Sequence, residues 1–402
     1  MEFTDEWSEH KFENIFDIKN GLNKGKDYFG EGIRILNYMD VNKYELNTEN
    51  TIKGLVELTD DEIERYSVKP NDLFFTRTSE TSEEIGLTSA YMGNTIKCVF
   101  SGFLLRARPK IDLNSLFFAY YLRSPRQRNN IIKFSSITTR ALISGGNLSK
   151  MKIKYPSIEE QNKIANLFLI LDKKVELLEK KYREYQCFKK YLMQKLFAQE
   201  LRFDDNCQYK TKRVKDFLIE SKIEGIDDIN KRLTVKLNLN GITVRESKTI
   251  EIEGATKQFI RKTGQFIYGK QNLHKGAFGI IPKELDGYLT SSDIPSFDFK
   301  GGIEPKWFYY YFARKSFYEK LENLSTGTGS KRISPKEFLN IKIIVPEFKE
   351  QHKIVCLLEK FDEKINGISN QIVQMNMFKK SLLQQMFVVQ LILSLLQNKK
   401  HI

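Results

Sequence analysis

The feature that most constrains the fold of this chain is an internal repeat of 50 residues. Residues 148–197 align without a gap onto residues 338–387, and sixteen of the fifty paired positions are identical. Both copies contain the motif P-x-x-x-E-Q-x-K-I, which starts at Pro156 in the first and at Pro346 in the second, and both contain F-K-K near their end. A repeat of this kind indicates that one structural unit occurs twice in the chain.

Each copy has the pattern of a long helix. No Gly or Pro interrupts residues 157–200, the second copy contains only Gly367, and acidic residues follow each opening proline. Apolar residues recur at alternating steps of four and three, which is the spacing of a coiled-coil seam. The seam residues are Ile164, Phe168, Leu171, Val175 and Leu178 in the first helix and Ile354, Leu358, Phe361, Ile365 and Ile368 in the second. The matched seams predict that the helices pair, although a helix that only covers the core of its own domain would show a similar stripe.

An aromatic segment precedes each long helix. Leu116–Arg123 resembles Trp307–Arg314, and we expect both to form helices that begin near Asn114 and Pro305. Aromatic side chains can stack on nucleic-acid bases, but at continuous helical spacing they more often fill a core. We therefore predict that these two helices are buried.

The rest of each domain contains short strands. Residues 71–77 and 264–270 are rich in β-forming side chains and lie between turns rich in Gly and Ser. The predicted fold class is therefore α+β, with two mixed α/β domains that alternate with two long helices.

The charge of the chain suggests a polyanionic partner. The formal net charge is +14. Residues 1–96 carry 10 basic and 20 acidic side chains, whereas residues 97–147 carry 9 basic and 1 acidic. The first domain is thus strongly polarised.

The motifs of several enzyme classes are missing from the sequence. There is no Gly-rich loop or N-P-P-Y-type tetrapeptide of an adenine methyltransferase, and no G-x-x-x-x-G-K-[ST] phosphate loop. Asp204 or Asp205 with Glu220-Ser221-Lys222 imitates a magnesium-dependent nuclease motif, but such a match arises easily by chance in a chain with 29% charged residues. We predict no catalytic residues and no metal site.

The cysteine spacing argues against a zinc site, and the hydropathy of the chain argues against a membrane protein. The four cysteines lie far apart and lack zinc-site spacing, so we expect reduced thiols. The longest apolar run, residues 387–396, is too short to cross a bilayer, and the N-terminus does not have the pattern of a secretion signal. We expect a cytoplasmic protein without a membrane partner.

The order of domain, helix, domain, helix, with P-x-x-x-E-Q-x-K-I and F-K-K in each helix, resembles the specificity subunits of Type I restriction-modification enzymes. The resemblance covers nearly the whole chain. It implies two target recognition domains, each reading one half of a split, asymmetric DNA site, and spacer helices that pair as an antiparallel coiled coil. The corresponding segments are residues 1–147 (first target recognition domain), 148–203 (central spacer helix), 204–337 (second target recognition domain), 338–390 (C-terminal spacer helix) and 391–402 (tail).

The resemblance also implies which partners the chain has. It predicts a non-catalytic recognition subunit that binds double-stranded DNA and works with two methyltransferase subunits and with motor-nuclease subunits. S-adenosylmethionine, ATP and magnesium would be bound by those partners, and no cofactor by this chain. We expect the faces of the helices outside the seam to bind the methyltransferases.

Loops of the two domains are the expected DNA contacts. Phosphate contacts fix position, and Arg, Lys, Asn and Gln are the side chains best suited to reading base edges. The candidates in the first domain are Arg77, Thr78, Ser79, Arg126, Arg128, Lys133, Thr139 and Arg140. The candidates in the second are Lys270, Asn272, Lys275, Thr328, Ser330, Lys331 and Arg332.

Three other functions remain open at this point. A coiled-coil adaptor without sequence preference would bind DNA only through salt-sensitive charge contacts, or not at all. A specificity subunit of a related fused methylase-nuclease system would share the same sequence features. A nuclease-like enzyme would use Asp205, Glu220 and Lys222, and would cut DNA in a magnesium-dependent manner on its own.

Overall fold

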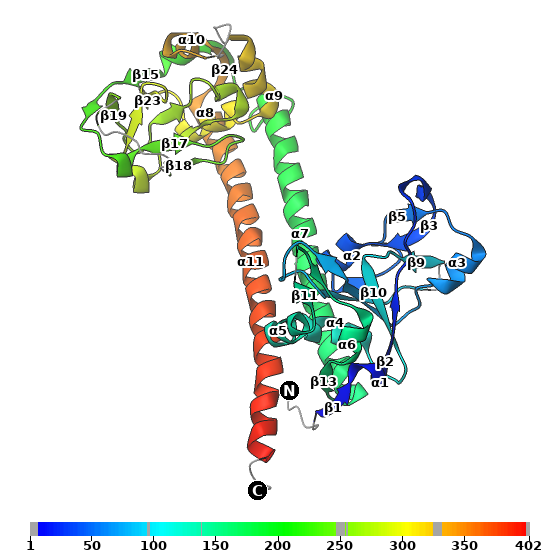
Figure 1. Cartoon of the computed structure of the whole chain (residues 1–402). Helices are drawn as coiled ribbons and strands as arrows, with labels where there is room; N and C mark the ends of the chain where they lie inside the picture. The colour runs from blue at the N-terminus through cyan, green and yellow to red at the C-terminus, as the bar shows by residue number, and fades with distance from the viewer. Residues whose placement is uncertain are drawn as a thin grey trace. The chain divides into compact units, whose positions relative to one another are not determined.

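A computed structural model describes residues 7–94, 97–137, 139–246, 254, 256–324 and 332–398, with side chains as far as residue 387 (Figure 1). The chain divides into two compact units. The first is Met1–Leu178 with Asn370–Ile402, and the second is Glu179–Ser369. Each unit therefore holds one mixed α/β domain together with one part of each long helix.

The domain of the first unit is built on a five-stranded sheet. Its strand order is β2 (Phe16–Asn20), β10 (Leu104–Pro109), β6 (Asp72–Thr76), β8 (Thr88–Tyr91), β4 (Leu46–Asn47). Neighbouring strands are antiparallel except β4 and β8, which are parallel. The smaller sheets are β5 (Gly54–Val56), β3 (Phe29–Leu36) and β9 (Cys98–Phe100); β11 (Ser136–Ile137), β12 (Ala141–Leu142) and β7 (Thr78–Ser79); and β1 (Ser8–Lys11) with β13 (Lys152–Tyr155). Its short helices are α1 (Phe12–Ile15), α2 (Tyr38–Lys43), α3 (Asp60–Arg65), α4 (Ser115–Leu122), α5 (Pro125–Lys133), α6 (Gly145–Ser149) and the 3-10 helix η1 (Lys26–Tyr28).

The domain of the second unit repeats this plan with a four-stranded antiparallel sheet. Its strand order is β15 (Leu218–Ser221), β23 (Ser296–Phe299), β20 (Phe266–Tyr268), β21 (Phe278–Ile280). The smaller sheets are β16 (Glu224–Gly225), β19 (Gln258–Ile260) and β22 (Leu289–Ser291); β17 (Leu233–Val235) and β18 (Ile242–Val244); and β14 (Tyr209–Arg213) with β24 (Lys342–Pro346). The short helices are α8 (Pro305–Phe312), α9 (Lys315–Tyr318), α10 (Pro335–Asn340) and the 3-10 helices η2 (Val214–Asp216), η3 (Ile229–Lys231), η4 (Leu273–Lys275), η5 (Lys283–Leu285) and η6 (Glu319–Leu324). The two domains thus share one fold although their sequences differ.

The aromatic helices α4 and α8 lie in the cores, as predicted. Every residue of α4 is buried, and the side chain of Asn114 caps the helix by accepting hydrogen bonds from the N–H groups of Leu116 and Phe117. Helix α8 begins at Pro305, whose missing N–H costs nothing at the first position of a helix. Because their rings are enclosed, these aromatics are not platforms for nucleic-acid bases.

The structure corrects the alignment of these two helices by one residue. The sequence comparison matched Leu116 with Trp307. In the structure, however, Tyr120 donates to Asp172 and Tyr310 donates to Asp362, each over 2.6 Å. The aromatic helices therefore follow the same offset as the long helices. A second tyrosine, Tyr121 or Tyr311, follows each of these tyrosines and hid this register, because a shift of one position still aligned aromatic with aromatic.

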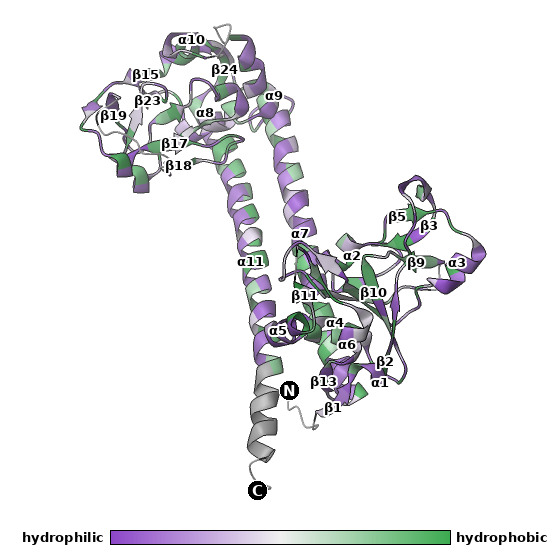
Figure 2. Ribbon diagram, in the orientation of Figure 1, coloured by the Kyte–Doolittle hydropathy of each residue, from purple (hydrophilic) through white to green (hydrophobic). Residues whose placement is uncertain are grey.

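The two long helices, α7 (Ile158–Phe197) and α11 (Phe348–Asn398), confirm the helical reading of the repeat. Figure 2 shows apolar and polar residues alternating along both helices. Among the predicted seam residues, Ile164, Phe168, Leu178, Ile354, Leu358, Ile365 and Ile368 are buried, and Leu171, Val175 and Phe361 are half-buried. In the part of the chain that the structure describes, no helix is long and apolar enough to span a membrane.

The helices run antiparallel within each unit. In the first unit, Phe168 stacks on Phe387 and Asp172 binds Lys379, so positions rise on α7 as they fall on α11. In the second unit, Lys189 binds Asp362, while Phe203, just beyond α7, donates its N–H to Glu350 near the start of α11.

The seam residues serve both predicted purposes: they pair the two helices and they cover the domain cores. The buried side chains of Ile164 and Phe168 belong to the core of the first domain, and Phe387 from the far end of α11 lies in that same core. Ile354 and Leu358 lie in the core of the second domain, and Phe197 from the end of α7 joins them there. Each helix thus starts in one core and ends in the other.

The repeat contains more than a helix. Its first residues form β13 and β24, which pair with β1 and β14. The helices themselves begin at Ile158 and Phe348, so the first residues of the predicted spacer segments 148–203 and 338–390 are part of the domains. At the other end, α11 continues to Asn398, into the segment predicted as a tail.

The shared glutamine of the motif has a structural role in each copy. The side-chain oxygen of Gln161 accepts a hydrogen bond from the N–H of Asn114, and its amide donates to the carbonyl of Pro156. In the second unit, Gln351 makes the equivalent pair of bonds to Glu304 and Pro346. The P-x-x-x-E-Q spacing therefore joins the start of the long helix to the start of the aromatic helix, and satisfies backbone groups that burial would leave unpaired.

Candidate nucleic-acid interface

In the first domain, three predicted contacts meet where strand β6 ends. Arg77 follows β6 directly, its N–H donates to the carbonyl of Phe103 over 2.8 Å, and its own carbonyl accepts from the N–H of Ile143 over 3.0 Å. Thr78 and Ser79 form β7, which pairs with β12 in the segment just after Arg140. Two segments more than 60 positions apart in the sequence are thereby brought to one edge of the domain.

In the second domain, Lys270 has the same surroundings. Its N–H donates to the carbonyl of Asp293 over 2.9 Å, and its carbonyl accepts from the N–H of Ile333 over 2.9 Å. Arg332, which precedes Ile333, forms an ion pair of 3.1 Å with Asp293. The predicted loops around Lys270 and Arg332 therefore lie together.

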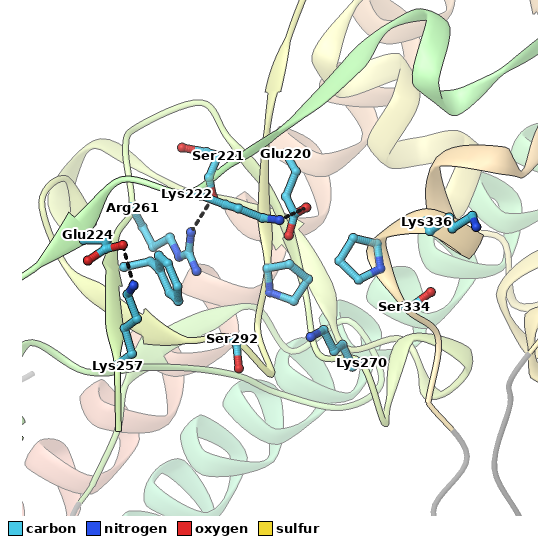
Figure 3. Close-up of a pocket in the computed structure, with 13 residues that line it drawn as sticks. Glu220, Ser221, Lys222, Glu224, Lys257, Arg261, Lys270, Ser292, Ser334 and Lys336 are labelled. Atoms are coloured by element: carbon cyan, nitrogen blue, oxygen red, sulfur yellow. Dashed lines mark hydrogen bonds and ion pairs between the residues drawn. The ribbon is translucent and has the colours of Figure 1, made fainter. Parts of the chain in front are cut away.

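A cleft of about 550 Å³ opens beside Lys270 (Figure 3). Its lining residues are Glu220, Ser221, Lys222, Glu224, Lys257, Phe259, Arg261, Lys270, Ser292, Pro295, Ser334, Pro335 and Lys336. Figure 3 draws Lys336 and Ser334 on one side of the cleft and Lys257 and Glu224 on the other. Five basic side chains against two acidic ones make this lining suited to an anionic partner.

Some basic side chains of this cleft already have a partner within the protein, and others do not. Lys222 pairs with Glu220 over 3.0 Å, and Lys257 pairs with Glu224. Arg261 is buried and donates to the hydroxyl of Ser296 over 2.8 Å, and burial lowers its pKa to about 10. Among the described residues, the ammonium groups of Lys270 and Lys336 have no such partner.

A second cleft, of about 460 Å³, lies beside Arg77 in the first domain. Its lining residues are Glu13, Phe16, Asp17, Ile18, Asn20, Arg77, Lys110, Ser144, Gly145, Gly146 and Ser149. The two clefts are lined by equivalent elements. Strand β2 and helix α6 contribute residues to the cleft of the first domain, and strand β15 and helix α10 contribute residues to the cleft of the second. Lys110 donates to the carbonyl of Glu13, which fixes its ammonium group at the rim.

Much of the positive charge of residues 97–147 is used inside the first domain. Arg108 binds Asp72 through two bonds of 2.7 and 2.8 Å, and Arg106 is 3% exposed and donates to the carbonyl of Ser67. Arg123 donates to backbone carbonyls, including that of Thr88 over 2.7 Å. The charge polarity seen in the sequence is therefore only partly a surface property.

Arg128 is one of these inward-facing arginines, although the sequence suggested it as a DNA contact. Its guanidinium donates to the carbonyls of Glu83 and Ile85, and burial lowers its pKa to about 10. A guanidinium held by backbone carbonyls in this way is occupied by the fold. We therefore exclude Arg128 from the proposed interface, and the same holds for Ser79, which is 6% exposed.

The other predicted contacts are exposed, except for Asn272, which is half-buried, and for three that lie outside the described residues. Arg126 and Lys133 are exposed on α5, and Thr139 and Arg140 are exposed in the loop before β12. Lys275 is exposed at the end of η4, and Asn272 immediately precedes that helix. The predicted contacts Thr328, Ser330 and Lys331 lie outside the described residues.

The nuclease-like triplet sits in the lysine-rich cleft. Glu220 forms an ion pair with Lys222, which is two residues away on the same chain segment. Asp204 accepts a hydrogen bond from the N–H of Asn206 and does not line this cleft, and neither does Asp205. Within the described ranges, no group of three or more His, Cys, Asp or Glu side chains could hold a metal ion.

Sequence reasoning missed a cluster of three polar side chains that occurs once in each unit. In the first unit, Asp172 of α7 accepts from Tyr120 of α4 over 2.6 Å and from Lys379 of α11 over 2.5 Å. In the second, Asp362 of α11 accepts from Tyr310 of α8 over 2.6 Å and from Lys189 of α7 over 2.5 Å.

Each of these clusters ties one domain to both long helices. The lysine also lies over the ring of the tyrosine, at 5.3 Å for Lys379 and 4.8 Å for Lys189. The repeated aspartate and lysine were visible in the sequence as identities, but their tyrosine partner was hidden by the misaligned aromatic helix.

The architecture defines the class of the chain. It is a recognition subunit in which two domains of one fold are built on two long helices, with a cleft beside a basic residue, Arg77 or Lys270, in each domain. The chain belongs to the Type I restriction modification DNA specificity domain family, whose sequence profile matches residues 4–184 and 207–375.

Curated and structural relatives agree with this family. A protein of Methanocaldococcus jannaschii assigned as the MjaX type I restriction enzyme specificity subunit is 24% identical over 408 residues, covering 95% of this chain and 93% of that protein. The crystal structure of the S subunit of a Type I restriction-modification system from M. genitalium is similar in fold, with a TM-score of 0.55, 15% identity and coverage of 96% of this chain and 97% of that one. The HsdS subunit from Thermoanaerobacter tengcongensis has a TM-score of 0.52 at 13% identity, covering 95% and 96% of the two chains.

Proposed function

We propose that this specificity subunit reads a split, asymmetric DNA site, with one half of the site contacted by each domain. The observation that carries the proposal is the matched pair of clefts, each bordered by loops that bring basic side chains together. The two domains share a fold but differ in the residues that line their clefts. Two different readers joined by helices would select two different half-sites.

The contacts we propose are the exposed and half-buried members of the predicted set, without Arg128, whose guanidinium is held by backbone carbonyls. They are Arg77, Thr78, Arg126, Lys133, Thr139 and Arg140 in the first domain and Lys270, Asn272, Lys275 and Arg332 in the second. Thr328, Ser330 and Lys331 remain predictions from the sequence. Basic side chains would supply both phosphate contacts and base-edge contacts in the major groove.

We further propose that the chain is a non-catalytic subunit of a larger complex in the cytoplasm. Two methyltransferase subunits would modify adenine, and motor-nuclease subunits would act on unmodified DNA. S-adenosylmethionine, ATP and magnesium would be bound by those partners. The exposed faces of α7 and α11 would bind the methyltransferases, since these faces carry apolar side chains that are 50–66% exposed, namely Ile170, Leu177, Phe188, Tyr191, Val373, Met377 and Phe378.

The experiment that tests this function is methylome sequencing. Cells that carry this chain together with a Type I methyltransferase subunit would be compared with cells that carry the methyltransferase alone. We expect a split adenine-methylated motif only when this chain is present. Co-purification of the two proteins without any motif would refute sequence reading and would favour a coiled-coil adaptor without sequence preference.

The nuclease alternative has its own measurement. The isolated chain would be incubated with DNA and magnesium, and a Glu220→Gln variant would serve as the control. We expect no cleavage, because Glu220 is paired with Lys222 and, among the described residues, Glu224 is the only other carboxylate that lines the cleft. Cleavage that the variant abolishes would overturn our assignment of a non-catalytic subunit.

A further inference from the structure

We propose that Arg77 and Lys270 are one structurally equivalent position in the two domains, and that each contacts a phosphate of the DNA backbone at its cleft. This inference rests on the proposed DNA-reading function and adds to it the residue that anchors each domain. Such contacts fix the register of a protein on DNA without specifying a base.

The equivalence follows from the hydrogen bonds that enclose each residue. Both residues follow the corresponding strand of the central sheet, β6 or β20, and both donate their N–H to the loop that leads into the neighbouring strand, β10 or β23. The carbonyl of each accepts from an isoleucine that precedes the corresponding short helix, Ile143 before α6 and Ile333 before α10. The two isoleucines are themselves related by the offset of the repeat.

This equivalence was not visible in the sequence. Arg77 and Lys270 do not obey the repeat offset, because the two domains have different loop lengths between the strands and the long helices. Only the tertiary hydrogen bonds place them at the same point. The same position of the fold therefore carries a basic residue in both domains, although the sequences around it do not align.

Both cations are held in place without being neutralised. Arg77 and Lys270 are half-buried, and their backbones are fixed on both sides. The Nε of Arg77 is buried with no hydrogen-bond partner among the described residues, and its Nη1 donates only a long bond of 3.4 Å to the carbonyl of Gly102. In the same described ranges, Lys270 forms no ion pair, whereas its neighbours Lys222 and Lys257 do. A half-buried cation without an anion loses part of its hydration, and a bound anion would offset that loss.

The chemistry that the two residues share points to phosphate. Arginine and lysine can both reach the O6 and N7 acceptors of guanine, but arginine presents a rigid planar fork of donors and lysine a single ammonium group, so the two are not interchangeable as base readers. Both are suitable for a phosphate oxygen, for which positive charge is the main requirement. A position that carries Arg in one domain and Lys in the other therefore fits a backbone contact.

The test measures DNA binding by the full chain as a function of salt. The variants are Arg77→Gln and Lys270→Gln, which remove charge, with Arg77→Lys and Lys270→Arg as matched controls that keep it. Two duplexes of equal length serve as probes, one with the methylated motif found by methylome sequencing and one with that motif scrambled. Affinities are measured at several salt concentrations between roughly 50 and 200 mM.

We expect each glutamine variant to lower the salt slope of log K by about 0.9, the value for one lost phosphate contact, and to weaken binding at 0.1 M salt roughly eightfold. The loss should be equal for both duplexes, the charge-retaining controls should behave as wild type, and the methylated motif should not change. Unchanged thermal unfolding would show that the glutamine variants fold.

Other outcomes separate the two levels of the proposal. If wild type directs methylation of a split motif but the glutamine variants keep its salt slope, the phosphate assignment is wrong and the proposed function stands. If a variant changes the base preference at one position of the motif, the residue reads a base and the assignment is again wrong. If wild type itself directs no methylation motif, the proposed function fails first.

Discussion

Replacing Tyr310 by phenylalanine tests whether the tyrosine, aspartate and lysine cluster holds the second domain to its helices. The Tyr310 hydroxyl donates to Asp362 over 2.6 Å, and the tyrosine is only 6% exposed. Burial and this carboxylate raise the pKa of Tyr310, so the hydroxyl stays a donor throughout the range in which the protein would be studied. A hydrogen bond to a charged acceptor contributes about 1.5–3 kcal/mol, and we expect Tyr310→Phe to lower the free energy of unfolding by about 2 kcal/mol.

Replacing Asp362 by alanine removes more than this one bond. It also leaves the ammonium of Lys189, whose side chain is 15% exposed, without its partner at 2.5 Å. Because the Asp362 side chain is 40% exposed, water replaces part of the loss, and we expect a cost of about 3 kcal/mol, the lower end of the roughly 3–5 kcal/mol for a fully buried pair. The double variant should also cost about 3 kcal/mol, because removing the Tyr310 hydroxyl breaks no further hydrogen bond once Asp362 is absent.

The assay is a double-mutant cycle by chemical denaturation of the full chain. We expect a coupling free energy of about 2 kcal/mol between Tyr310 and Asp362. The cycle of Tyr120 and Asp172 in the first unit is the matched control and should give a coupling of similar size, because its hydrogen bond is also 2.6 Å long. Additive effects, within about 0.5 kcal/mol, would refute the view that these clusters join the domains to the helices.

Two further predictions concern the first unit. Phe387→Ala should lower the free energy of unfolding of the first unit by about 3–5 kcal/mol, because the ring is 4% exposed and lies in the core. Phe378→Ala is the control: its ring is 55% exposed, and in the same thermal-unfolding measurement it should cost less than about 1 kcal/mol. Equal losses would contradict the burial of Phe387. Burial raises the pKa of Glu45, but the charges of Arg123 and Lys379 outweigh burial and leave the pKa below the usual 4.5. The ionised Glu45 side chain therefore stabilises the fold above pH 4.5, and this stabilisation is lost as the pH falls through the lowered pKa. Denaturation at pH 7 and at about pH 4 should show a smaller acid loss for Glu45→Gln than for wild type, and an identical loss would contradict this role.

Three of the identical residues of the repeat, a glutamine, an aspartate and a lysine, make equivalent contacts in both copies. Gln161 and Gln351 satisfy backbone groups at the start of both the long helix and the aromatic helix. Asp172 and Asp362 bind a tyrosine of the nearby domain and a lysine of the other helix. These three pairs of identities therefore join each domain to the two helices, and the loops that we propose to contact DNA lie outside the repeat.

Features that depend on a local pattern could be predicted from the sequence. The uninterrupted four-and-three spacing predicted the long helices, and the aromatic runs predicted buried helices that begin at Asn114 and Pro305. These predictions succeeded because helix formation and amphipathic burial repeat with a fixed period along the chain, which a single sequence displays directly. The family was recognisable for the same reason, since its motif lies in those helices.

The exposure of individual basic residues could not be predicted from the sequence. Arg128 and Arg77 both looked like surface arginines in a positively charged segment or loop, yet Arg128 is held by backbone carbonyls and Arg77 lines a cleft. Lys270 and Arg77 also came to equivalent positions only through long-range hydrogen bonds. The physical reason is that burial and pairing of a charge depend on neighbours distant in the sequence, whereas composition and spacing record only that the charge is present.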